Sequence, residues 1–125
     1  TSAEPWGLDI TLEVALGGQL ISRPPFRGMY WTAAQQLAHL TINGAHLRTG
    51  DLFASGTVSG AAPEQRGSLL ELSWNGSAPL TLADGSTRGF LADGDEVSIT
   101  ATAPGPGGTI VGLGEVRGRI ARRIP

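Results

Sequence analysis

The chain has 125 residues, of which 40% are hydrophobic and 16% are charged, and its formal net charge is -2. This length supports one hydrophobic core and is short for two, so we predict a single domain spanning residues 1–125. The weak acidic balance gives no reason to bind nucleic acid or an anionic membrane surface. Thr1–Trp6 carries no targeting signal, and the chain has no cysteine. We therefore predict no nucleic-acid partner, no membrane partner and a cytoplasmic location.

The first predicted element is a β-hairpin. Apolar and polar residues alternate from Gly7 to Leu16, which is the period-two pattern of a half-buried strand. Gly17–Gly18 then predicts a tight turn, with the chain returning through Gln19–Ser22.

The next segment changes to a helical period. Apolar residues recur three or four apart within Met29–Ile42, and Thr32, Gln35 and His39 share the opposite face. We predict one amphipathic helix here, ended near Asn43–Gly44 by residues suited to a left-handed backbone.

Short strand-like runs separated by turn signals fill the rest of the chain. Asn-Gly and Asp-Gly pairs between them tolerate the positive φ angles of tight turns. The fold class we predict is mainly β with one amphipathic helix, arranged as a mixed β-sandwich roll. The predicted strands are Leu52–Ser55, Leu69–Trp74, Leu80–Leu82, Val97–Ala103, Thr109–Leu113 and Glu115–Ile120.

Several chance motifs carry no function. Gly112–Gly118 has its third glycine one position too late for a dinucleotide fingerprint and precedes more strand pattern. Gly56–Gly60 lacks the central serine of a nucleophile elbow. His39 and His46 lie seven apart with no carboxylate at ligand spacing, so we predict no metal site from them. The arginines Arg117, Arg119, Arg122 and Arg123 fit a solvated edge-strand face better than a phosphate site.

The stretch Gly50–Gly60 is the first that carries chemical information. A short apolar run leads directly into a loop of small residues, which exposes backbone N–H groups and the hydroxyls of Thr57 and Ser59. Such a loop is suited to hold a carboxylate or another anionic group of a ligand. A strand followed by a flexible turn explains the same glycines, so both interpretations stand.

The second informative stretch is Gly67–Trp74. Strand alternation would place Leu70, Leu72 and Trp74 on one face and Glu71 on the other, among apolar neighbours. An acid there either faces solvent or is paired, because an unpaired buried charge is costly. A paired acid commonly orients a histidine that acts as a general base.

Together these runs resemble the C-terminal region of the fumarylacetoacetate hydrolase family. The helix and the Gly-Asp-strand-Gly-Thr portion are shared across the family, whereas Leu-Glu-Leu-Ser-Trp is typical of its fumarylacetoacetase branch. The order and spacing agree across nearly the whole chain. The runs that carry the resemblance are Met29–Leu37, Asn43–Gly44, Leu47–Thr57, Gly67–Trp74 and Phe90–Val97.

The resemblance implies a hydrolase that cleaves the carbon–carbon bond of fumarylacetoacetate to fumarate and acetoacetate, in tyrosine and phenylalanine catabolism. In that family a histidine activates water, an acid orients the histidine, and a divalent metal, Mg²⁺ or Ca²⁺, stabilises the enolate leaving group. Glu71 matches the orienting acid, and Thr57 with Gly56 matches the loop that binds the substrate's carboxylate. The resemblance also implies a homodimer of the full-length protein.

The departures from the family pattern are as informative as the matches. We find no counterpart of the metal-binding carboxylates, the catalytic histidine, or the catalytic lysine and arginine, and the region from Ser22 to Arg27 is shorter than in the family. We therefore expect a catalytic fragment that is inactive by itself. Two alternatives remain: a non-catalytic β-rich binding module with the same fold, and a related keto-acid hydratase or decarboxylase.

Overall fold

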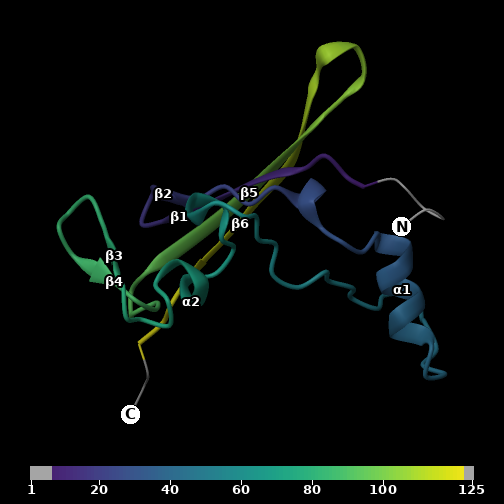
Figure 1. The fold of residues 1–125 in the computed structure, drawn as a ribbon, viewed down its shortest axis with the longest axis horizontal. Coiled ribbons are helices and arrows are strands. Elements are labelled where there is room, and N and C mark those ends of the chain that lie inside the picture. The colour runs from purple at the N-terminus through teal and green to yellow at the C-terminus, as the bar shows by residue number, and fades with distance from the viewer. Residues whose placement is uncertain (1–6, 123–125) are drawn as a thin grey trace.

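The N-terminal alternation forms a β-hairpin in a four-stranded antiparallel sheet (Figure 1). The computed structural model describes residues 7–122, so Thr1–Trp6 and Arg123 lie outside the described part. Strands β1 (Thr11–Leu16) and β2 (Gln19–Ser22) are joined by the predicted Gly17–Gly18 turn, in which φ is +57° and +82°. The strand order is β2-β1-β5-β6, and β1 pairs with β5 from Thr11↔Thr102 to Leu16↔Val97.

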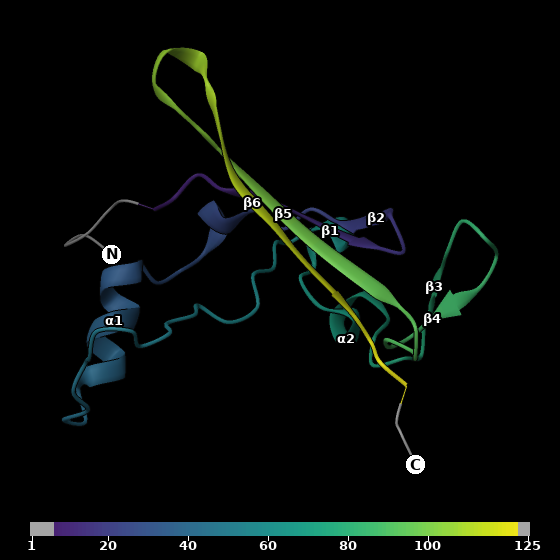
Figure 2. The same cartoon turned by 180° about the vertical axis from the view of Figure 1, so that it is seen from behind.

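The two long C-terminal strands form a hairpin that extends beyond the rest of the sheet. Strand β5 spans Glu96–Pro104, a short turn η3 covers Pro106–Gly108, and β6 spans Ile110–Arg119. Figures 1 and 2 show its tip well away from the other strands. The two runs predicted around Gly114 are one strand. Gly114, with φ of +85°, lies where the β5–β6 register shifts between Thr100 and Thr102. A bulge therefore replaces the expected strand break.

The edge position of β6 confirms the interpretation of two of the arginines. Arg117 donates to Glu115 at 2.9 Å, and Arg119 donates to Glu96 at 3.0 Å. Their side chains remain 56% and 67% exposed, as expected for charges on a solvated edge strand.

The predicted amphipathic helix begins later than its periodicity indicated. Helix α1 spans Ala33–Thr41, because Thr32 caps its first turn. The Thr32 hydroxyl accepts from the Gln35 N–H at 3.2 Å, and the Gln35 side-chain oxygen accepts from the Thr32 N–H at 3.0 Å. The predicted left-handed end is confirmed at Gly44, where φ is +85°. No residue of α1 is buried, and Figure 2 shows α1 at the end of the molecule away from β3 and β4.

Two strand predictions are wrong. Leu52–Ser55 forms neither strand nor helix, and Leu52 is 96% exposed. A strand needs a neighbour to satisfy its backbone groups, and within residues 7–122 none lies alongside. Leu69–Trp74 instead begins with a single helical turn, α2 (Leu69–Leu72), after the short turn η2 (Pro63–Gln65). A further short turn, η1 (Phe26–Gly28), follows β2.

A two-stranded ribbon completes the described structure. Strands β3 (Leu80–Thr81) and β4 (Thr87–Arg88) pair across the predicted Asp84–Gly85 turn, in which the Leu82 N–H donates to the Ser86 carbonyl at 2.8 Å. The mainly β fold class is confirmed, with α2 added to the one helix expected. No helix within residues 7–122 is long and apolar enough to cross a bilayer.

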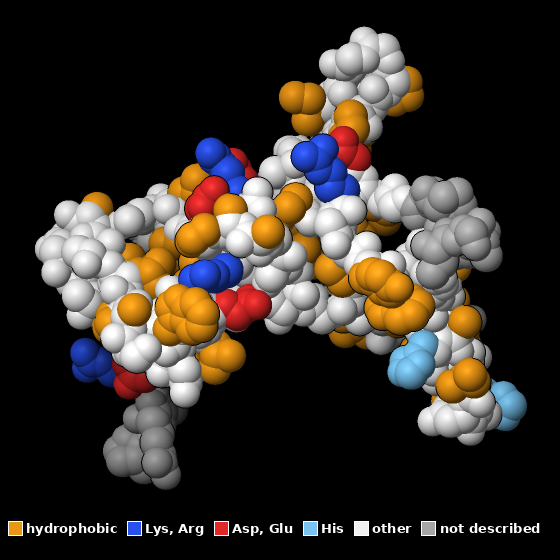
Figure 3. Space-filling model, viewed as in Figure 1, with side chains coloured by type: hydrophobic (Ala, Val, Ile, Leu, Met, Phe, Trp, Pro, Cys, Tyr) orange, Lys and Arg blue, Asp and Glu red, His pale blue; other side chains and the backbone are white. Residues whose placement is uncertain are grey.

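The core is much smaller than an ordinary domain of this length would have. The buried hydrophobic side chains of the described part are Leu16, at 2% exposure, and Val58, at 9%. Large hydrophobic residues such as Ile42, Ile110 and Val116 are more than 70% exposed, and Figure 3 shows groups of exposed apolar side chains at several places on one face. The accessible surface is 9031 Å², against about 6,300 Å² for a folded monomer of this mass. The described residues therefore bury much less apolar surface than one ordinary core would.

Candidate active site

The Gly-Thr loop, Gly56–Thr57, lies in a stretch of the chain that is neither helix nor strand, and it exposes the residues predicted to bind substrate. Gly56 has φ of +80°, a conformation that suits glycine and turns the chain. Thr57 next to it is exposed, whereas Val58 is buried and Ser59 is half-buried. This order points Val58 into the protein and leaves the Thr57 side chain accessible to a ligand.

Gly67 brings this loop against the segment that carries Glu71. A Cβ atom at Gly67 would overlap the carbonyl oxygen of Val58 and come within 3.0 Å of Thr57 Cγ2. Only glycine allows the two backbones to approach so closely. A second link is the hydrogen bond from the Gly60 N–H to the Gln65 carbonyl at 2.8 Å. The two stretches singled out in the sequence are therefore neighbours.

Helix α2 explains how the Glu71 side chain is held. The Ser68 hydroxyl caps the helix by accepting from the Glu71 N–H at 3.3 Å, and it donates to Glu71 Oε2 at 3.1 Å. Ser59, twelve residues earlier, donates to the same Oε2 at 2.6 Å. Within residues 7–122, no side-chain donor reaches Oε1. Two serine hydroxyls thus hold the same carboxylate oxygen, Oε2.

These contacts favour the ionised acid. The Ser59 hydroxyl is the main cause that lowers the pKa of Glu71 below its ordinary value. Burial opposes the shift, while the Ser68 hydroxyl and the N–H groups of Gly67 and Ser68 support it. At neutral pH Glu71 is a carboxylate that can accept a hydrogen bond.

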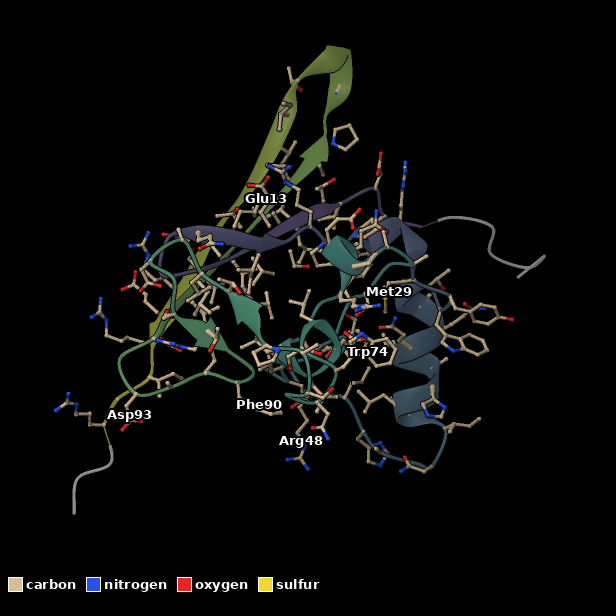
Figure 4. The ribbon with its side chains drawn as sticks, turned by 60° about the vertical axis from the view of Figure 1, so that its left-hand side comes forward. Glu13, Met29, Arg48, Trp74, Phe90 and Asp93 are labelled. Atoms are coloured by element: carbon tan, nitrogen blue, oxygen red, sulfur yellow. The ribbon has the colours of Figure 1, made fainter. Side chains whose placement is uncertain are left out.

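An arginine and an aromatic ring flank this acid. The Arg66 guanidinium lies 5.1 Å from the centroid of the Trp74 ring and donates to the main-chain oxygen of Glu71 at 3.4 Å. Trp74 is in the left-handed region, with φ of +48°, and its side chain is 65% exposed. Figure 4 labels Trp74 beside α2.

The side-chain directions predicted around Glu71 are wrong, because this segment is a helical turn. The segment was expected to be a strand with Leu70, Leu72 and Trp74 on one face. In the helical turn, Leu69 and Leu72 line an apolar hollow beside the sheet instead, with Val14 and Val97. The missed signal is the sequence Ser68-x-x-Glu71 before an apolar run, which is a helix-capping pattern.

The described residues supply neither a histidine for Glu71 nor a metal site. Both histidine side chains lie at the α1 end of the molecule (Figure 3), and neither forms a hydrogen bond to Glu71 within residues 7–122. No group of three histidine, aspartate or glutamate residues converges in this part of the chain. The donor set present here therefore does not fit a bound divalent metal.

Comparison of the sequence with known protein families identifies the class of protein to which this fold and site belong. The family model described as the C-terminal part of fumarylacetoacetate (FAA) hydrolase matches residues 1–121. The chain belongs to the fumarylacetoacetate hydrolase family.

The curated relatives share one name. The chain is 50% identical to the fumarylacetoacetase of Homo sapiens over 123 residues, which is 94% of this chain and 29% of the relative. It is 46% identical to that of Arabidopsis thaliana and 42% identical to that of Caenorhabditis elegans, with the same shares covered. The chain thus spans less than a third of the length of these relatives.

Proposed function

We propose that this chain forms one wall of the active site of a fumarylacetoacetase, which hydrolyses fumarylacetoacetate to fumarate and acetoacetate. The observation that carries the proposal is the ionised Glu71, held through Oε2 by the Ser59 and Ser68 hydroxyls, beside the exposed Gly56–Thr57 loop. This arrangement suits a carboxylate that orients a histidine next to a site for an anionic substrate group.

Each residue would have a separate task. Glu71 Oε1 would accept a hydrogen bond from an imidazole N–H, which fixes the tautomer of the ring and stabilises the imidazolium formed as water attacks. Gly56 would expose the backbone of the loop, and the Thr57 hydroxyl would donate to the substrate's carboxylate. Thr57 would thus position the substrate without transferring a proton.

The remaining parts of the reaction would come from outside this chain. The histidine that activates water would be supplied by another segment of the enzyme. When bound, a divalent metal, Mg²⁺ or Ca²⁺, would stabilise the enolate of the leaving acetoacetate. Since the donor set here does not fit a metal, its ligands would also lie elsewhere. We expect the isolated chain to be inactive for this reason.

The large exposed surface supports assignment to a larger enzyme. The chain exposes roughly 2,700 Å² more than a folded monomer of its mass. An apolar hollow of about 410 Å³ lies open between α2 and the sheet. Such surfaces become stable when other protein segments cover them. The proposal includes the homodimeric state, the cytoplasmic location and the place in tyrosine and phenylalanine breakdown.

Two other functions would use the same fold. A non-catalytic binding module would keep the Gly-Thr loop, but would have no use for a carboxylate held in place by two serine hydroxyls. A keto-acid hydratase or decarboxylase would share the enolate chemistry. The Leu-Glu-Leu-Ser-Trp run at residues 70–74 and the names of the relatives favour the hydrolase.

The test is an assay of the full-length protein with fumarylacetoacetate and Mg²⁺ or Ca²⁺. We expect Glu71→Gln to lower kcat by about 10² to 10⁴, because the histidine loses its orienting partner. Thr57→Val should raise KM more than it lowers kcat, since it removes a positioning contact. Ser77→Ala, which removes an exposed hydroxyl bonded to the Trp74 carbonyl at 2.7 Å, is the control. An inactive full-length protein, or one indifferent to Glu71→Gln, would contradict the proposal.

A further inference from the structure

One hydroxyl connects the two halves of the candidate site. Ser59 Oγ donates to Glu71 Oε2 at 2.6 Å and accepts from the Gly67 N–H at 3.0 Å. A serine hydroxyl has one donor proton, and here that proton points to the carboxylate while a lone pair receives the backbone N–H. Ser59 also lies two residues after Thr57, on the loop proposed to bind substrate.

We propose that Ser59 is a positioning residue of the hydrolase: its hydroxyl orients Glu71 and fixes this carboxylate relative to the Gly56–Thr57 loop. The inference rests on the function proposed above. The Ser59 and Ser68 hydroxyls both bond Oε2, and within residues 7–122 no side chain donates to Oε1, which is the oxygen that would receive an imidazole N–H. The bond from Ser59 sets the spacing between the acid that orients the base and the residues that bind the substrate.

The contribution of Ser59 differs from that of Ser68. Ser68 is three residues from Glu71, and its hydroxyl already serves the helix cap by accepting the Glu71 N–H. Its bond to Oε2 is longer, at 3.1 Å against 2.6 Å for Ser59. Ser68 therefore holds the carboxylate to its own helix, whereas Ser59 holds it to a separate segment.

No other charged group within residues 7–122 competes for the Glu71 side chain. Arg66, the cation nearest in the hydrogen-bond network, donates to the main-chain oxygen of Glu71 at 3.4 Å and stacks on Trp74. The side-chain bonds come from the two serine hydroxyls. Removal of the Ser59 hydroxyl therefore removes the shorter of two side-chain restraints on Oε2.

The experiment is a double-mutant cycle in the full-length enzyme, with kcat and KM for fumarylacetoacetate measured for Ser59→Ala, Glu71→Gln, the double variant and the control Ser77→Ala. We expect Ser59→Ala to lower kcat on the order of tenfold, because a misplaced catalytic partner reacts slowly. In the Glu71→Gln background the same change should lower kcat less than about twofold, since Ser59 acts through Glu71. Ser59→Thr, which keeps the hydroxyl, should stay within about threefold of the wild type.

The pH dependence of kcat is a second measurement, and a purely structural role of Ser59 would leave it unchanged. Loss of the Ser59 hydroxyl removes the main cause that lowers the pKa of Glu71. The acid limb of the kcat profile should therefore move to higher pH in Ser59→Ala and stay in place in Ser77→Ala.

The outcomes separate this inference from the proposed function. Three results would overturn the positioning role. Ser59→Ala could lower kcat equally in the wild-type and Glu71→Gln backgrounds, or it could leave kcat unchanged. Ser59→Thr could also lower kcat as much as Ser59→Ala does. If Glu71→Gln itself keeps full kcat, the proposed function fails and the positioning role fails with it. If Glu71→Gln is impaired and Ser59→Ala is not, only the positioning inference fails.

Discussion

Ser73 is the most deeply buried polar residue described, and its replacement by alanine tests how the end of α2 is held. Its side chain is 0% exposed. The hydroxyl donates to the Gly89 carbonyl at 2.9 Å and accepts from the Gly76 N–H at 2.9 Å. Ser73→Ala would leave both backbone groups without this partner. Each unsatisfied buried group costs about 1–3 kcal/mol, so we expect a local loss of about 3 kcal/mol.

Amide hydrogen exchange in the full-length protein measures this loss where it occurs. A local opening free energy lower by about 3 kcal/mol corresponds to exchange roughly 100-fold faster in peptides covering residues 69–78. Ser77→Ala is the matched control, because its exposed hydroxyl bonds a carbonyl in the same turn, and it should change exchange less than about threefold. An acceleration below about threefold in Ser73→Ala would refute the reasoning, because it would mean that both groups find other partners.

Two further predictions follow from close contacts elsewhere. Gly67→Ala should raise KM for fumarylacetoacetate about tenfold or more, because the added Cβ forces the Gly-Thr loop away from Glu71. The control is Gly118→Ala, which should leave KM unchanged because no atom lies near the Cβ position. Equal KM values for the two variants would contradict the close approach at Gly67. Arg88 donates to both oxygens of Asp95 at 2.9 and 3.1 Å, and this bond is the main cause that lowers the pKa of Asp95 below its ordinary 3.8. Stability from a lowered pKa is present above the ordinary value and lost as pH falls through the folded value. Asp95→Asn should therefore cost about 2 kcal/mol at pH 7, and the gap in melting temperature should close below pH 4; a gap independent of pH would contradict it.

Local patterns predicted the elements whose partners are close in sequence. The β1–β2 hairpin, the Asp84–Gly85 turn and the end of α1 near Gly44 follow from alternation and from glycines that adopt positive φ. The start of α1 was missed by four residues, because a cap at Thr32 depends on hydrogen bonds that periodicity does not report. The predicted single domain, the Glu71 and Thr57 roles and the choice of metal stay predictions.

The sequence by itself determined the family and the two stretches that carry chemistry, because these depend on the identity and order of residues such as Glu71 and Thr57. Only the tertiary structure decided that Leu69–Leu72 is helical, that Ser59 reaches Glu71 and that Leu52–Ser55 has no strand partner in the described part. The physical reason is that the short apolar run at Leu69 is compatible with both the helical period and the strand period. The local cap at Ser68 favours the helix, and the close approach of Gly67 to Val58 and its bond to Ser59 fix it against a separate segment.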